Sequence, residues 1–405
     1  MNMKRLLVFF VAISFIIPVS AMAEDKTVEE RLKALEDVLS GIKPYASVRF
    51  GTYYEKSSSR FSSDSDSVTK MNTTRQITGP DQRMTQWDLA NNSRVGLMVD
   101  RKDGLGGRVE YALKSDDTFK LRLGYGTYTC PAGATFLIGQ DYTPLSEWDY
   151  SSQVFKSDNA LAGWGMIDTD GKQLTQVKIK WKGVQLAFVN QKSSTTTSYA
   201  SGPIPSGTTL TMANEIVFPH VEAKYRFSTN MFFSDIFGGY GKYEVDSTTV
   251  DIDRNIRSYA AGTGCGVNIE PVFVKGMVWT ALNGKQMGLH QANAAGAAID
   301  TAANGYSVIN ERSVGFAAVA GVKISKVKVE AGYGLVSAKK PTSTYNNDKA
   351  RNYYLNANIP VAQNVLKTAS FFIVPEIGVY DYMKNSTGAE EGRISYAGAK
   401  WQIDF

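Results

Sequence analysis

The chain has 405 residues, and its 44 Lys and Arg side chains nearly balance its 39 Asp and Glu side chains, leaving a net charge of +5. So weak an excess of positive charge does not favour nucleic acid as a partner. The two cysteines, Cys130 and Cys265, exclude a disulfide framework and show no zinc or redox spacing. We interpret them as two unrelated thiols, and a single disulfide is the alternative.

The first 23 residues have the pattern of a secretory signal peptide. Lys4 and Arg5 precede an apolar run, Leu6–Val19, and a small-residue cleavage site follows at residues 21–23. After that site no stretch approaches the roughly 18 to 20 apolar residues of a membrane-spanning helix. The sequence therefore predicts an exported protein whose mature chain starts at Glu24. Three alternatives follow: a protein that is soluble in the periplasm, a secreted protein, or a β-barrel in an outer membrane.

A short helix is predicted from Thr27 to Ile42, within a periplasmic segment formed by residues 24–43. Its apolar residues repeat at steps of four and three, like the seam of a coiled coil, and Thr27 and Glu30 have capping-box spacing. About two heptads are too few to be stable alone. Two interpretations are open: a helix braced by partner copies in a trimer, or a frayed linker.

From residue 44 to residue 405, apolar and polar residues alternate with a period of two, which is typical of strands with two different faces. In the first of these stretches, Val48 and Phe50 share one face and Arg49 lies on the other. Pro219, Pro360 and Pro375 fall inside strand-like runs, so counts of fourteen and eighteen strands stay open beside sixteen. The sixteen predicted strands are Tyr45–Tyr54, Trp87–Val99, Leu105–Lys114, Phe119–Thr129, Ala134–Gln140, Thr175–Lys182, Val184–Gln191, Glu215–Phe227, Met231–Val245, Ile256–Glu270, Val272–Leu282, Tyr306–Ile324, Lys328–Ser337, Arg351–Pro360, Thr368–Met383 and Arg393–Phe405.

The connections between these strands alternate in length. Tight turns such as Arg101–Gly104 and Lys182–Gly183 alternate with long polar segments such as Lys192–Asn214 and Asn283–Gly305. Short turns at one rim and long loops at the other are the pattern of outer-membrane barrels. We therefore predict an all-β fold, a transmembrane antiparallel up-and-down β-barrel of about 16 strands, with outer-membrane lipid around it.

The stretch Tyr142–Lys172 interrupts the strands and is long and mixed in character. It carries Trp148, Trp164 and several carboxylates. Long connections without secondary structure are uncommon in compact proteins and are usually functional. We predict that residues 142–172 fold into the bore of the barrel and narrow it. The alternative is an extracellular surface loop that covers one rim.

The final strand, Arg393–Phe405, gives the most specific local pattern. Trp401 and Ile403 share one face, and Lys400 and Gln402 share the other. A lysine that faced lipid at the midplane would cost about 2–4 kcal/mol. The strand is therefore expected to turn Trp401 to lipid and Lys400 to the lumen.

Three segments resemble Gram-negative outer-membrane general porins. Residues 396–405 look like the C-terminal signature of outer-membrane proteins, and Asn92–Leu97 with Asp103–Tyr111 is similar to the second and third porin strands. Phe136–Leu145 resembles the porin strand that leads into the constriction loop. The pattern covers nearly the whole mature chain, although only these segments are specific.

The resemblance implies a homotrimer of 16-stranded barrels through which small hydrophilic solutes and ions diffuse passively. It also implies an inward third loop whose carboxylates face arginines of the wall, an arrangement that orders water and selects polar solutes. Carried over to this sequence, the loop carboxylates are Glu147, Asp149 and Asp158, and the wall cations are Arg49, Arg94, Arg108 and Arg122. Gln140 departs from the family pattern, because many relatives have arginine there.

Catalysis finds little support in the sequence. The two histidines, His220 and His290, lie in no G-x-S-x-G or H-E-x-x-H motif. We predict no enzyme activity, no metal and no cofactor. The predicted function is a passive diffusion porin. The alternatives are a substrate-selective channel and a structural or adhesive barrel that the 142–172 loop plugs.

Overall fold

The computed structural model describes Glu29, Leu32 and most residues from 41 to 405. Within that range it leaves out residues 62–76, 78, 91, 114–117, 147–148, 156–158, 160, 168–172, 191–197, 201–212, 217, 248–251, 290–296, 301–306, 340–346, 366–368 and 386–387. The predicted signal peptide, residues 1–23, lies outside the described residues. Within the described ranges, no helix has the length and apolar character needed to cross a bilayer.

Most of the helix predicted from Thr27 to Ile42 also lies outside the described residues, so the structure gives it no support. Only Glu29 and Leu32 are described within its central part, and both have helical backbone. Its predicted end is wrong, because Ile42 is already the first residue of β1 and pairs with Val99. The period-two pattern of the first strand therefore extends three residues further toward the N-terminus than predicted.

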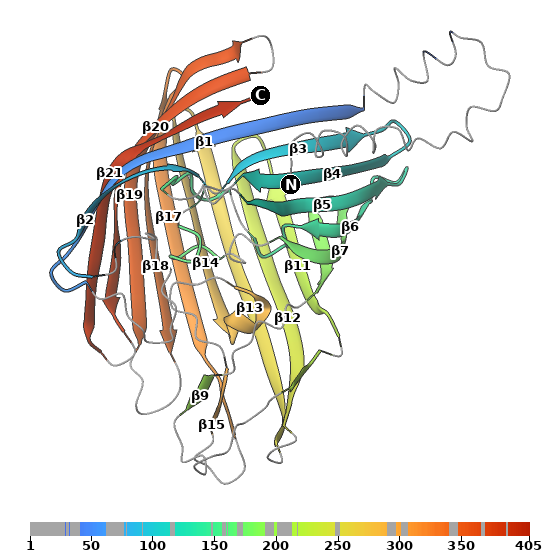
Figure 1. The fold of residues 1–405 in the computed structure, drawn as a ribbon. Helices are drawn as coiled ribbons and strands as arrows, with labels where there is room; N and C mark the ends of the chain where they lie inside the picture. The colour runs from blue at the N-terminus through green and yellow to red at the C-terminus, as the bar shows by residue number, and fades with distance from the viewer. Residues whose placement is uncertain are drawn as a thin grey trace.

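The main sheet is a closed ring of antiparallel strands (Figure 1). It contains 18 strand segments, but β2 and β3 pair with successive parts of β1, and β10 and β11 pair with successive parts of β12. Each of these two couples is therefore one interrupted strand. The last strand, β21, pairs with β1 from Ser47 to Ser57 and closes the ring. The prediction of sixteen strands is confirmed.

The strands of the ring follow the chain order. Their bounds are β1 (Ile42–Ser57), β2 (Arg83–Leu89), β3 (Ser93–Asp100), β4 (Leu105–Leu113), β5 (Phe119–Thr129), β6 (Thr135–Asp141), β7 (Leu174–Trp181), β8 (Val184–Val189), β10 (Ala213–Glu215), β11 (His220–Ser228), β12 (Phe232–Ser247), β13 (Ile252–Ile269), β14 (Val272–Leu282), β17 (Arg312–Ile324), β18 (Val327–Lys339), β19 (Asp348–Val365), β20 (Ala369–Lys384) and β21 (Glu390–Asp404).

Side chains alternate between the inside and the outside of the ring, as the pleat of a strand requires. In β21, Trp401 is 39% exposed and Ile403 40%, whereas Lys400 is only 6% exposed. In β1, Val48 is 39% exposed and its neighbour Arg49 only 3%. The faces predicted for the first and last strands are therefore correct.

A bulge in β5 breaks this alternation. Glu110 of β4 pairs with Leu123, but the next residue, Tyr111, pairs with Leu121, so Arg122 is an extra residue. A strict period of two would place Leu123 outside with Leu121. Instead Leu123 is 2% exposed and Leu121 is 38% exposed. The bulge re-aims the side chains that follow it.

The two rims differ as the alternating connections predict. At the short-turn rim, Gly104 has a φ of 84°, and a Cβ there would lie 2.4 Å from the carbonyl oxygen of Thr129, so the turn needs glycine. At the other rim, two long connections meet in a separate three-stranded sheet. Its strands are β9 (Ser198–Ala200), β15 (Ala298–Asp300) and β16 (Ser307–Ile309).

The three prolines inside predicted strands do not change the strand count. Pro219 lies in the break between β10 and β11, and Pro360 lies next to a register shift in β19. Pro375 is paired opposite Ala399 of β21. The break at Pro219 and the register shift beside Pro360 absorb residues that cannot donate a backbone hydrogen bond.

Candidate functional site

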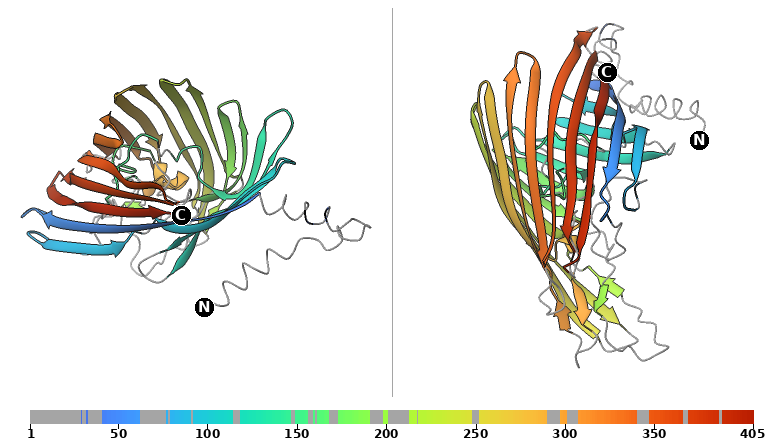
Figure 2. Two further views of the ribbon diagram at one scale, coloured as in Figure 1. Left: turned by 90° about the horizontal axis from the view of Figure 1, so that it is seen from above. Right: turned by 90° about the vertical axis from the view of Figure 1, so that its left-hand side faces the viewer.

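The described residues of the connection between β6 and β7 lie inside the ring (Figure 2). The connection leaves and re-enters the sheet at a single register pair, Asp141 and Leu174. Seen from above, it lies within the circle of strands, together with the short 3-10 helix η2 (Gly284–Met287) (Figure 2). We refer to residues 142–173 as the inner loop. Its described hydrophobic side chains are almost all buried against the wall.

The most complete anchor of the inner loop is Glu376 in β20. This carboxylate is 2% exposed. It accepts hydrogen bonds from the backbone N–H groups of Val154 (2.8 Å) and Phe155 (2.9 Å). It also accepts bonds from the Asn356 amide (2.9 Å) and the Tyr396 hydroxyl (3.0 Å). Hydrogen bonds to a charged acceptor are the stronger kind, so Glu376 fixes the turn of the loop against β19 to β21.

Three further wall carboxylates hold the inner loop in the same manner. The bonds run from the Ser152 N–H to Glu330 (2.8 Å), from the Leu145 N–H to Glu222 (3.1 Å) and from the Tyr150 hydroxyl to Asp235 (2.7 Å). These carboxylates belong to β18, β11 and β12, respectively. The loop is therefore tied to the side of the ring that β11 to β21 form.

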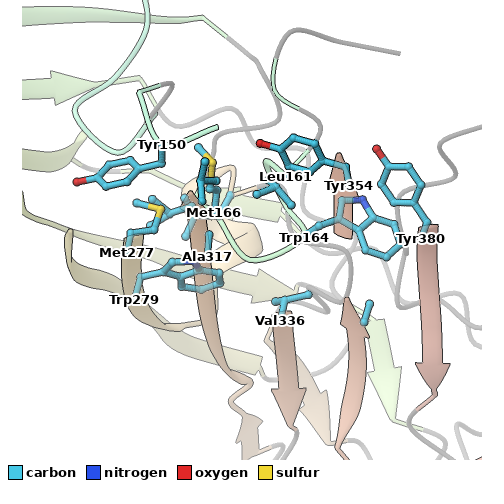
Figure 3. Packing of buried hydrophobic residues seen from close by; sticks show 14 of the residues in the cluster. Tyr150, Leu161, Trp164, Met166, Met277, Trp279, Ala317, Val336, Tyr354 and Tyr380 are labelled. Atoms are coloured by element: carbon cyan, nitrogen blue, oxygen red, sulfur yellow. The ribbon is translucent and has the colours of Figure 1, made fainter. Parts of the chain in front are cut away.

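Apolar side chains of the inner loop pack beside these bonds. Trp164 is fully buried, with its ring centroid 4.8 Å from that of Tyr380 and 5.1 Å from that of Tyr382. Figure 3 shows Trp164 lying beside Tyr380. Phe155 stacks on Tyr396 with centroids 3.9 Å apart. Burial stabilises by about 1.5–3 kcal/mol for each large apolar side chain, so the loop and the wall share a hydrophobic core inside the barrel.

The backbone of the inner loop touches the backbone of the wall at Gly165. A Cβ at this position would lie 2.2 Å from the carbonyl oxygen of Phe316 and 2.6 Å from the nitrogen of Leu335. The φ of 134° also disfavours any other residue. The Trp279 indole N–H donates to the Gly165 carbonyl at 2.8 Å. Only glycine allows so close an approach.

A second connection also enters the ring, and the sequence pattern did not predict it. The stretch after Asn283 is polar in composition, but Met287 of η2 is fully buried. A Cβ on Gly239 of β12 would lie 2.7 Å from the Met287 Cε and 3.2 Å from a Leu145 side-chain carbon. The two inward segments therefore meet on β12. An isolated pair of apolar residues, Met287 and Leu289, was the signal for this packing.

The four predicted wall arginines lie on the inner side of β1, β3, β4 and β5, and three of them converge on Glu110. The nitrogen–oxygen distances to Glu110 are 2.7 Å from Arg108, 2.8 Å from Arg122 and 3.9 Å from Arg94. Arg49 donates through its Nε to the Ser47 hydroxyl at 2.9 Å. Sequence reasoning missed Glu110 as the centre of this cluster, although Glu110 lies two positions after Arg108 and therefore on the same face of β4. Arginines outnumber the carboxylate, so this part of the wall is positive.

Asp149 is the one predicted loop carboxylate among the described residues, because Glu147 and Asp158 lie outside them. Its carboxylate pairs with Arg226 of β11, which also binds Asp235 at 2.5 Å. The Lys275 ammonium donates to the Asp149 carbonyl at 2.6 Å. The structure thus brings Asp149 together with cations of β11 and β14 rather than with the four predicted arginines.

The inside of the ring has two different sides. The inner loop covers the wall from β11 to β21, whereas β1 to β7 present fixed charges, including the buried pair of Lys178 and Asp141 at 2.5 Å. Fixed charges of this kind act on ions and polar solutes through their field.

Solved structures share this architecture, although no family model and no curated protein matches the sequence. The outer-membrane channel DcaP of Acinetobacter baumannii is 15% identical, with 90% of this chain and 97% of that chain covered and a TM-score of 0.62. OmpT of Vibrio cholerae, in trimer form, is 15% identical over 90% and 99%, with a TM-score of 0.52. OmpF of Salmonella typhi, in complex with daunomycin, is 10% identical over 89% and 97%, with a TM-score of 0.52. The chain has the fold of the outer-membrane porins.

Within this porin fold, the side chains to consider for catalysis or for binding a metal ion are His220, the two cysteines and any cluster of metal-ligating residues. His220 pairs with Glu222 at 2.9 Å, and the second oxygen of Glu222 holds the inner loop. Cys130 and Cys265 are both free. In the part of the chain that the structure describes, no group of three or more His, Cys, Asp or Glu residues could hold a metal ion.

Proposed function

We propose that the chain is an outer-membrane porin of a Gram-negative bacterium, exported with a cleaved signal peptide, through which small hydrophilic solutes and ions diffuse passively. The observation that carries this proposal is an inner loop anchored inside a closed ring of sixteen strands, beside a wall of inward arginines. A closed barrel leaves no unpaired strand edge in a bilayer. A ring of sixteen strands is wide enough for an aqueous channel, and the inner loop narrows it. Passive diffusion of solutes through such a channel requires no enzyme activity.

The proposed assembly is a homotrimer. One solved structure with this fold, OmpT of Vibrio cholerae, is described as a trimer. The predicted helix within residues 24–43 would brace three copies through its apolar seam. Conductance that closes in three equal steps would support three pores in one assembly.

Arg94, Arg108 and Arg122 are proposed to border the aqueous path through the barrel, whereas Arg49 is almost fully buried in the wall beside them. Their positive charge should favour the passage of anions. Arg94→Gln with Arg108→Gln removes two of these charges but leaves Arg122 paired with Glu110 at 2.8 Å. We expect the anion-to-cation permeability ratio to fall at least about twofold, because the field in the pore selects ions. The measurement is the reversal potential of the purified protein in a planar bilayer under a potassium chloride gradient.

The matched control for this charge change is Lys102→Gln with Lys182→Gln, which removes two cations from short turns at the rim. That variant should keep the wild-type reversal potential. An unchanged potential in the arginine variant would show that the Glu110 cluster does not border the path.

The outward apolar face should lie in lipid. Ile377, in the middle of β20, is 54% exposed, and Val361, near the end of β19, is 52% exposed. We expect Ile377→Arg to lower the free energy of unfolding in lipid vesicles by about 2–4 kcal/mol, and Val361→Arg by only about 0–1 kcal/mol, since the cost of a charge falls toward the interface. Urea unfolding measures both, and equal effects would argue against this placement in the membrane.

A second candidate function is a structural or adhesive barrel that the inner loop plugs. The observation that favours it is the buried core around Trp164 and Phe155, which fills part of the bore with apolar side chains. A folded and inserted protein that passes no solute would support this function over diffusion. A substrate-selective channel would instead pass one solute much faster than others of equal size.

A further inference from the structure

A charged cavity lies apart from the inner loop, at the rim from which the long connections arise. Its volume is about 700 Å³, and strands β19, β20 and β21 line it together with the segment after β1. The charged residues of its lining are Arg60, Lys349, Arg351, Lys384 and Arg393, with Asp381 and Glu390. Five cations face two carboxylates, so the cavity is positive.

The strand alternation places the cationic wall of this cavity on the outer surface of the barrel. Asn352 points inward, where it bonds to Gln153 of the inner loop at 2.9 Å. Its neighbour Arg351 therefore points outward. By the same alternation Asp381 points outward beside the fully buried Tyr380, as does Arg393 beside the fully buried Ile394.

An apolar band lies directly below these charges on the same outer face. Tyr353, Leu355 and Ile377 are 37%, 46% and 54% exposed. Tyr353 follows Arg351 by two positions in β19, so the charged row begins where the apolar band ends. Aromatic residues commonly mark this boundary between hydrocarbon and water. The cavity thus lies at headgroup level, on the side of the long loops, which face the cell exterior in outer-membrane barrels.

The carboxylates of the cavity do not neutralise all of its cations. Asp381 pairs with Arg351 at 2.7 Å, and Glu390 pairs with Arg60. Lys349, Lys384 and Arg393 form no ion pair with the residues that the structure describes. Lys349 and Lys384 are also direct register partners on neighbouring strands. Like charges opposite each other destabilise a sheet, and an anion between them would relieve that repulsion.

We propose that this cavity binds a phosphate group on the headgroup of an outer-leaflet lipid. The guanidinium of Arg393 can bind phosphate oxygens in a bidentate manner, and the two lysines act as point charges beside it. The apolar band below the cavity provides a surface for the acyl chains, which favours a lipid over free phosphate. This inference rests on the outer-membrane location in the proposed function.

The test compares the full-length protein with Lys349→Gln, Lys384→Gln and Arg393→Gln combined. The control removes three cations from the opposite rim by Lys102→Gln, Lys182→Gln and Lys326→Gln. The probes are an acylated diphosphoryl glucosamine lipid, its dephosphorylated counterpart and inorganic phosphate, with bound lipid counted by native mass spectrometry in detergent. We expect the triple cavity variant to bind the phosphorylated lipid at least tenfold more weakly, and the control variant to bind it like the wild type.

Each other outcome argues against the lipid site. Equal binding of both lipids, or unchanged binding by the cavity variant, would mean that these cations do not bind the phosphate group of the lipid. Inorganic phosphate that competes at the affinity of the lipid would indicate a free-phosphate site. Loss of the oligomer in the cavity variant would make this face a contact between subunits. Conductance of the cavity variant is measured separately, so a failed lipid site is distinguishable from a failed porin.

Discussion

Replacing the inner loop with a tight turn is expected to raise the single-channel conductance several-fold. Asp141 and Leu174 are register partners at the points where the loop leaves and re-enters the sheet, so an Asn-Gly turn can join β6 directly to β7. The replacement removes the side chains of Trp164 and Phe155 from the bore, together with their buried contacts. The current through a water-filled pore rises with its open cross-section. Planar-bilayer recordings measure the change.

The truncated protein must still be folded for this result to count. Barrel formation is checked by heat-modifiable migration in gel electrophoresis and by β-sheet circular dichroism. A folded truncated barrel with wild-type conductance would show that the inner loop does not limit the path.

Glu376→Ala is expected to lower the free energy of unfolding by at least about 2 kcal/mol and to make the open-channel current noisy. The change leaves the N–H groups of Val154 and Phe155 and the Tyr396 hydroxyl without their acceptor, and each unsatisfied buried group costs about 1–3 kcal/mol. The inner loop then loses its most complete anchor and moves within the bore. Urea unfolding in vesicles and current noise in bilayers report the two effects.

A matched control for this substitution is Glu270→Ala in the turn before β14. The Glu270 side chain is 76% exposed, and a substitution at such a surface position usually changes stability by less than about 0.5 kcal/mol. Equal, small effects of the two substitutions would contradict the assignment of Glu376 as an anchor.

The strands of the barrel could be predicted from the sequence because their information is local. Each strand must present one face to the exterior and one to the interior, so the period of two is visible in a single stretch such as Lys400 to Ile403. The turn at Gly104 was predictable for the same reason, since its positive φ is a property of one residue. The extent of β1 was less predictable. Both faces of a strand approach water at its ends, so the difference in polarity between alternate residues becomes small there.

The anchors of the inner loop could not be predicted, because their partners are distant in the sequence. Glu376 stands in its strand like any inward polar residue, and nothing near it indicates a bond to the N–H of Val154, 222 residues away. The bulge at Arg122 is equally hidden, since it depends on how β5 pairs with β4. The resemblance to porins did name Arg94, Arg108 and Arg122 as cations of the wall, but their convergence on one partner, Glu110, became visible only in the structure. Their role in a constriction stays a prediction.

The most direct test of the central claim, an open path past the inner loop, is osmotic swelling of lipid vesicles that contain the purified protein. The account predicts swelling in isosmotic sugars and amino acids at rates that fall with solute size and depend little on solute identity. Absence of swelling, with protein that is shown to be folded and inserted, would contradict it and leave the plugged barrel as the better account.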